Sequence, residues 1–225
     1  ARDPQGLRGQ AQGAVRVLPD LPQLTRLDPA TLTLKSLLAK AAEPWDQQGA
    51  GDFWAPLHAF IRERVIYLFE QRGHDVRTVR AVLHAWPEGI NLVDARQKLD
   101  ALSQLTGSDE LRRVAELFKR VKNITKDVPR VTAVRRDALK EPAELALLEA
   151  LEQKQPAIAA AVARRDYRAA FVSIGALRGV VEAFFNDVLV MAEDPSLRAA
   201  RLDLVARLRD VVLDIADISE IVTGD

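Results

Sequence analysis

The side chains best suited to chemistry in this sequence are cations gathered in one stretch. Residues 112–140 contain ten lysines and arginines and three acids, an excess of seven positive charges. Arg112 and Lys119 stand seven residues apart, close to two helical turns, so they share one face of a helix. Arg113 and Arg120 repeat this spacing. The stretch predicts a phosphate-binding surface, since lysine and arginine bind phosphates by releasing counterions; a solvated helix face followed by a solvated linker is the alternative.

A second group combines flat rings with hydrogen-bonding side chains. Phe184 and Phe185 stand beside Asn186, and unpaired RNA bases are stacked on aromatic rings and read along their edges. Adjacent helical residues point about 100° apart, so one ring can enter the core while the other faces a groove. The alternative for the rings is that both lie in the core. Three arginines flank this segment and could reach phosphates or base edges, and the alternative for them is surface salt bridges. These arginines are Arg178, Arg198 and Arg201.

No set of residues predicts a catalytic, metal or cofactor site in this chain. The three histidines lack the four-residue helical spacing of a zinc motif, and there is no cysteine. His74 and Asp75 form the dipeptide of metal-dependent phosphohydrolases, but the other ligands are missing, and Asp75 is better interpreted as a helix cap. The aspartates of the last helix lack a histidine or a calcium loop beside them, so we expect a solvated or partner-facing acidic surface.

The composition narrows the class of protein. Of the 225 residues, 48% are hydrophobic, and 32 acids balance 32 lysines and arginines. A net charge of zero argues against a dedicated nucleic-acid binder unless the cations are segregated. The absence of cysteine fits a reducing compartment such as the cytoplasm. There is no continuous run of about 18 apolar residues, so no membrane span is expected, and the start at Ala1 suggests a fragment or a processed product.

Apolar residues recur three and four apart along most of the chain, which predicts an all-α protein built from helical bundles. Expected helix starts are Asp3, Asp28, Asp52, Asp75, Asn91, Asp109, Asp166 and Asp194. Gly73 is expected to end a helix in the left-handed conformation. Pro156 and Gly179 predict breaks, and one long helix is expected from Pro195 to Val222, with its aspartates opposite the apolar stripe.

The expected domains are N-terminal helices over 1–45, a helical subdomain over 52–126, a basic linker over 127–140 and a C-terminal bundle over 141–225. The first helices could also be the end of a preceding domain.

The last third of the chain resembles the DALR-type anticodon-binding domain of aminoacyl-tRNA synthetases. Asp194 and Leu197-Arg198 match the motif, while Pro195-Ser196 replaces its single alanine. The segments 181–195, Lys119–Ile124 and Asp3–Leu18 narrow the resemblance to the C-terminal region of the bacterial glycyl-tRNA synthetase β subunit.

This resemblance implies a non-catalytic module that binds the tRNA anticodon and supports ATP-dependent attachment of glycine by a partner α subunit. ATP and magnesium are then expected in that α subunit of a heterotetramer. Two alternatives remain: the related domain of an arginyl-tRNA synthetase, and a helical protein-interaction scaffold that uses the acidic last helix. The residues expected to bind tRNA are Arg112, Arg113, Lys119, Arg120, Lys122, Asn123, Lys126, Arg178, Phe184, Asn186, Arg198 and Arg201.

Overall fold

The computed structural model describes residues 7–26, 32–46, 54–86, 90–105 and 107–222. Over these residues the chain forms helices and turns without a β-strand, which confirms the all-α prediction. The chain divides into two compact units, 1–100 and 101–225, and the division falls inside α6 (Leu92–Ser103). The expected helix starts at Asp3, Asp28 and Asp52 lie outside the described residues.

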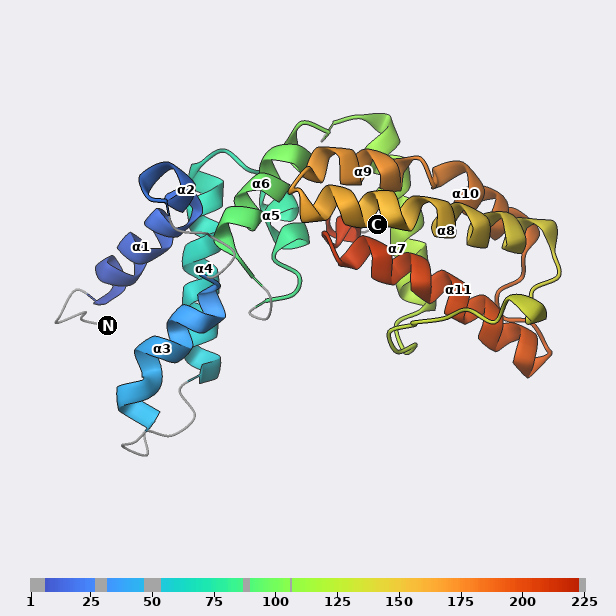
Figure 1. The fold of residues 1–225 in the computed structure, drawn as a ribbon, viewed down its shortest axis with the longest axis horizontal. Helices are drawn as coiled ribbons and strands as arrows, with labels where there is room; N and C mark the ends of the chain where they lie inside the picture. Colours follow the sequence, from blue (N-terminus) through green and yellow to red (C-terminus); the bar gives the residue numbers. More distant parts are fainter. Residues whose placement is uncertain (1–6, 27–31, 47–53, 87–89, 106, 223–225) are drawn as a thin grey trace. The chain divides into compact units, whose positions relative to one another are not determined.

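The first unit is a series of short and medium helices (Figure 1). They are α1 (Leu7–Val17), η1 (Leu18–Asp20), α2 (Leu21–Leu24), α3 (Leu34–Asp46), α4 (Trp54–Gln71) and α5 (Val76–Val82), followed by α6. α4 packs against both α1 and α5. Gly73 follows α4 with a φ of +88°, as the sequence predicted. Asp75 caps α5 by accepting a hydrogen bond from the Arg77 backbone N–H at 2.9 Å, so this aspartate is a helix cap.

An ionic cluster joins the helices of the first unit. The Asp20 carboxylate accepts hydrogen bonds from Arg72 Nη1 at 3.1 Å and Nη2 at 2.8 Å, and it also pairs with Arg96. His74 Nε2 lies 3.5 Å from an oxygen of Asp100. Burial lowers the pKa of His74, and the charge of Asp100 opposes this shift only in part. His74 is therefore engaged in packing within this unit.

The second unit contains the helices that carry the predicted site. They are α7 (Asp109–Ile124), η3 (Arg136–Ala138), α8 (Pro142–Ala163), α9 (Tyr167–Gly175), α10 (Arg178–Asp187), α11 (Pro195–Leu213) and η4 (Ile218–Ile221). α9 and α10 follow one another along α8 (Figure 1). α7 packs against α10, α11 and η4, so residues 109–124 belong with the C-terminal bundle. The sequence predicted a helical subdomain over 52–126, which groups α7 with the preceding helices instead of with the C-terminal bundle.

Side-chain caps fix several helix starts in the second unit. Asp194 accepts hydrogen bonds from the backbone N–H groups of Ser196 at 2.8 Å and Leu197 at 3.4 Å. Asp166 accepts one from Ala169 at 3.1 Å. Both caps confirm the sequence prediction, because a carboxylate at this position satisfies N–H groups that the helix itself leaves unpaired.

Two predicted boundaries are wrong. α8 continues through Pro156 to Ala163, although a proline inside a helix costs about 3 kcal/mol. Leu151 before it and Ile158 after it are buried, and burying each such side chain returns about 1.5–3 kcal/mol. The break expected at Gly179 falls earlier, since α9 ends at Gly175 and α10 begins at Arg178.

The last helix is also shorter than predicted. α11 ends at Leu213 rather than continuing to Val222. The Asp217 side chain accepts a hydrogen bond from the Ser219 backbone N–H at 3.2 Å and starts η4 instead. Asp217 is 4% exposed and Asp210 is 7% exposed, so the expectation of a solvated or partner-facing acidic surface is wrong for these two aspartates.

Candidate nucleic-acid interface

The outer face of α7 presents three of the predicted residues in one row, and a fourth follows in the turn after the helix. Arg112, Lys119 and Asn123 recur at spacings of seven and four, which keeps them on one side of the helix. Lys126 lies in the turn just after Ile124, the last residue of α7, and we count it with this row. The side chains of Arg112 and Lys126 are 64% and 74% exposed. Arg112 pairs with Asp109 at 2.8 Å, but an exposed pair of this kind contributes little free energy. The row therefore remains accessible to a phosphate.

Two arginines lie beside this row. Arg113 and Arg120 are exposed on α7. The Arg120 guanidinium carbon lies 4.3 Å from the centre of the Phe185 ring on α10. A cation over a ring keeps its full charge while the ring restricts its position. The structure thus holds the Arg120 guanidinium at the seam between α7 and α10 without neutralising it.

Lys122 is paired with an acid of the protein rather than free on the row. Its ammonium group pairs with the buried Asp217 carboxylate, and its side chain is 39% exposed. On the next loop, Arg130 Nη2 donates to both Asp214 oxygens at 2.7 Å. The hydrogen bond and the charge of Asp214 raise the pKa of Arg130. The aspartates of the C-terminal segment therefore neutralise part of the basic stretch.

The segment 127–140, expected to be a basic linker, is anchored to the helices on both of its sides. The Val131 backbone N–H donates to Asp210 at 2.8 Å. Arg135 Nη2 donates to the Ser196 carbonyl oxygen at 3.4 Å, and Arg136 Nη2 to Glu149 at 2.8 Å. These contacts fix the path of the segment along α8 and α11.

Phe184 cannot act as the expected base platform. Its side chain is 0% exposed, and the neighbouring Phe185 is 7% exposed. The two rings meet edge to face with centroids 5.4 Å apart, which is a favourable core geometry. Both rings therefore belong to the core, contrary to the expectation that one faces a groove. Asn186 is exposed at the end of α10.

The arginines expected to flank the base-reading segment have separate structural roles. Arg201 is 6% exposed; its Nε donates to Glu144 and its Nη1 to the Leu189 carbonyl oxygen at 2.7 Å. Arg198 Nη1 donates to the Ala192 carbonyl oxygen at 3.1 Å. Burial removes Arg201 from any surface that RNA can reach, so its predicted contact is corrected to a structural one.

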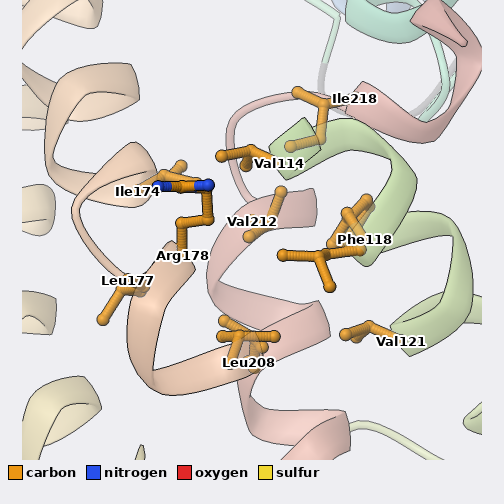
Figure 2. A pocket seen from close by; sticks show the side chains of 11 residues that line it. Val114, Phe118, Val121, Ile174, Leu177, Arg178, Leu208, Val212 and Ile218 are labelled. Carbon is orange, nitrogen blue, oxygen red and sulfur yellow. The ribbon is translucent and has the colours of Figure 1, made fainter. Parts of the chain in front are cut away.

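Arg178 lies among apolar side chains. It pairs with Glu182 at 3.2 Å and lines a pocket between α7, α9, α10 and α11 (Figure 2). The water-sized space in this pocket is about 20 Å³, close to the minimum for one water molecule. The pocket is therefore a packing gap rather than a site for a nucleobase.

Two exposed apolar residues escaped the sequence reasoning. Leu189 and Met191 are 71% and 60% exposed. Val188 and Val190, which precede them one by one along the chain, are 6% and 5% exposed and therefore buried. Side chains that alternate between two sides with a period of two are typical of extended backbone, and this spacing after the end of the helix could have indicated the two exposed residues. Arg201 holds the Leu189 carbonyl oxygen, so the backbone of this loop is fixed while two large side chains face water.

Other kinds of site find little support in the described part of the chain. Among the described residues, no group of three or more histidines and acids converges as metal ligands would. Residues Tyr167–Asp187 are apolar enough in composition for a membrane span, but they form two helices, α9 and α10. Phe171, Ile174 and Phe184 of this segment are buried in the bundle, which accounts for its apolar composition.

Comparison with known families agrees with this geometry. The family model described as "DALR anticodon binding domain" matches residues 110–222. This range begins in the first turn of α7 and ends just after η4, so it covers the bundle that carries the exposed cations. The chain belongs to the DALR anticodon binding domain family.

The most similar relatives reported narrow the class further. Over 98% of its length, the chain is 39% identical to the glycine–tRNA ligase beta subunit of Dechloromonas aromatica. It is 36% identical to that of Aromatoleum aromaticum and 37% to that of Anaeromyxobacter dehalogenans, again over 98% of its length. The chain spans about three tenths of the length of these relatives. It is therefore similar to one region of glycine–tRNA ligase beta subunits.

Proposed function

We propose that this chain binds the anticodon region of a tRNA as the non-catalytic tRNA-binding part of a glycine–tRNA ligase. The observation that carries the proposal is the row of surface cations on α7 and on the turn that follows it. This row lies within residues 110–222, which match an anticodon-binding family. Asn123, in the same row, offers an amide that can hydrogen-bond to a base edge.

The mechanism is phosphate contact followed by local recognition. The cations that remain at the surface of α7 and of the turn after it are Arg112, Arg113, Lys119, Arg120 and Lys126. If all five meet phosphates, the logarithm of the binding constant should fall with the logarithm of salt concentration with a slope of about −4. Buried residues such as Phe184 and Arg201 shape the bundle but do not touch the RNA.

The bond-forming chemistry is carried out by another subunit of the enzyme. Glycine activation requires ATP and magnesium, and we assign both to a partner α subunit of a heterotetrameric enzyme. The role of this chain is to hold the tRNA in a cytoplasmic ligase. The relatives reported above are glycine–tRNA ligase subunits, which favours this assignment over an arginyl-tRNA synthetase.

The contacts of three aspartates count against the rival hypothesis, which is a scaffold that docks through an acidic last helix. Asp210 and Asp217 are buried, and Asp214 is paired with Arg130. These carboxylates are occupied within the chain, so they do not form a free acidic surface for another protein.

The test is a tRNA titration of the chain by fluorescence anisotropy at several salt concentrations. The double variant Lys119→Ala/Lys126→Ala should weaken binding and reduce the salt slope by about two. Arg168→Ala is the control, because it removes an exposed arginine from α9, outside the α7 row. Equal effects of the two variants would contradict the proposed interface.

A second arm tests anticodon recognition. Glycine tRNA should bind more tightly than the same tRNA with an exchanged anticodon, because base contacts carry the sequence information and phosphate contacts do not. Equal binding of both would reduce the role to general phosphate contact, and absence of binding at low salt would refute the proposal.

A further inference from the structure

The loop that follows α7 is held by a single buried arginine on α11. Arg209 is 7% exposed, and its Nη1 donates to the carbonyl oxygens of Thr125 at 2.6 Å and Val128 at 2.8 Å. Its Nη2 donates to the Pro129 carbonyl oxygen at 3.2 Å. One guanidinium therefore holds three carbonyl groups of residues 125–129, which are about 80 residues away in the sequence.

The aspartate next to this arginine completes the contact. Arg209 Nε donates to Asp210 Oδ1 at 2.9 Å, and Nη2 lies 2.7 Å from the same oxygen. The other oxygen, Asp210 Oδ2, accepts a hydrogen bond from the Val131 backbone N–H at 2.8 Å. Four of the five N–H donors of the guanidinium thus have hydrogen-bond partners, and Nη2 also lies within ion-pair distance of Asp210. We call this pair with its loop contacts the Arg209 clamp.

The clamp fixes the backbone of a loop whose charged side chains face water. Lys126 is 74% exposed and Arg130 is 67% exposed, whereas Thr125 is 0% exposed. Capping the carbonyl end of α7 does not by itself require a buried ion pair, because water or a glycine turn can satisfy those groups. A buried charged pair carries a desolvation cost. A function for the pair, namely holding the loop cations in a fixed position, accounts for its presence despite this cost.

We propose that Arg209 positions the loop 125–131 for RNA contact, so that Lys126 meets a phosphate with little loss of conformational freedom. Arg130 meets a second phosphate by exchanging its ion pair with Asp214, which is exposed on both sides and therefore contributes little free energy. This inference rests on the proposed tRNA-binding function and extends it to a residue that never touches the RNA. Fixing a binding loop beforehand increases affinity, because less order has to be created on association.

The test compares variants of the 225-residue chain. Arg209→Met/Asp210→Asn removes both charges of the clamp, and the asparagine oxygen can still accept the Val131 N–H. Backbone amides of residues 126–131 should then exchange hydrogen faster, while those of α8 keep their protection. The dissociation constant for glycine tRNA should rise by about threefold to tenfold at low salt.

A coupling measurement separates positioning from a general structural role. In a Lys126→Ala/Arg130→Ala background, the clamp variant should change tRNA affinity by less than about twofold, since the cations it positions are gone. Equal losses in both backgrounds would overturn the inference. Arg209→Lys is the second variant if the double variant does not fold, because one ammonium cannot hold three carbonyl groups and a carboxylate together.

Each failure has its own signature. Absence of tRNA binding by the unaltered chain would overturn the proposed function and this inference together. Binding by the unaltered chain, with unchanged affinity in clamp variants whose loop amides exchange faster, would overturn the inference alone.

Discussion

Replacing Arg201 with methionine should destabilise the second unit without removing a tRNA contact. The Glu144 side chain is 0% exposed, and its other oxygen accepts the backbone N–H groups of Lys140 at 2.7 Å and Glu141 at 2.9 Å. Without Arg201 this carboxylate is buried with no cation, which costs about 3–5 kcal/mol. For a unit of this size, the melting temperature should fall by roughly 10–20 °C, measured by circular dichroism.

A matched control lies on the same helix. Arg198 is half-buried, and within the described residues its side chain donates one hydrogen bond, to the Ala192 carbonyl oxygen at 3.1 Å, so Arg198→Met should cost only about 1 kcal/mol. Adding Glu144→Gln to Arg201→Met should recover about 1–2 kcal/mol, because a neutral amide is less costly to bury than a carboxylate.

The binding readout completes this test. Well below its melting temperature, the Arg201→Met variant should bind glycine tRNA within about twofold of the unaltered chain, because the guanidinium it loses is buried. The reasoning is refuted if Arg201→Met melts like Arg198→Met while its tRNA affinity falls more than about tenfold.

Three further predictions concern charge, pH and packing. Asp214→Asn releases Arg130 from its carboxylate partner and should tighten tRNA binding by about threefold at low salt; weaker binding in an anisotropy titration would contradict this. Because burial lowers the pKa of His74 below 6.5, the unfolded chain binds more protons than the folded one just below pH 6.5, and the free energy of unfolding should fall as the pH decreases through that value. His74→Gln should remove this pH dependence of the free energy of unfolding, measured by calorimetric melts between about pH 7 and 5.5. A pH dependence that the substitution leaves unchanged would refute the prediction. Phe184→Leu should cost about 1–2 kcal/mol of stability and leave the tRNA dissociation constant unchanged in the same titration. A loss of tRNA affinity in the folded variant would contradict this prediction and indicate that Phe184 contacts the RNA.

The features that sequence reasoning predicted well are local. A capping carboxylate such as Asp75 or Asp194 bonds to backbone groups two or three residues away. The capping residue and the helix start that it stabilises are therefore both visible in one short stretch of sequence. The same holds for Gly73, whose positive φ depends only on the helix that it ends. The apolar period of α7 likewise predicted which side of that helix is exposed.

The features that it missed depend on contacts between distant segments. Arg201 and Arg209 are eight residues apart and lie on the same side of α11 as the buried Val205. An arginine within an apolar helical stripe indicates a buried polar contact, but spacing cannot identify Glu144 as the partner of Arg201 or the Thr125 carbonyl oxygen as a partner of Arg209. The aspartates were misassigned for the same reason, since the cations that pair with Asp214 and Asp217 come from the loop after α7 and from α7 itself.

The exposed loop after α10 provides a single chemical handle on the bundle. Met191 is the only methionine in a sequence without cysteine, and its side chain is 60% exposed. A thioether-selective reagent, or isotopic enrichment of the methionine methyl group, would therefore report from one defined position. A dye or a methyl resonance placed there would record events at the end of α10 with no engineered substitution.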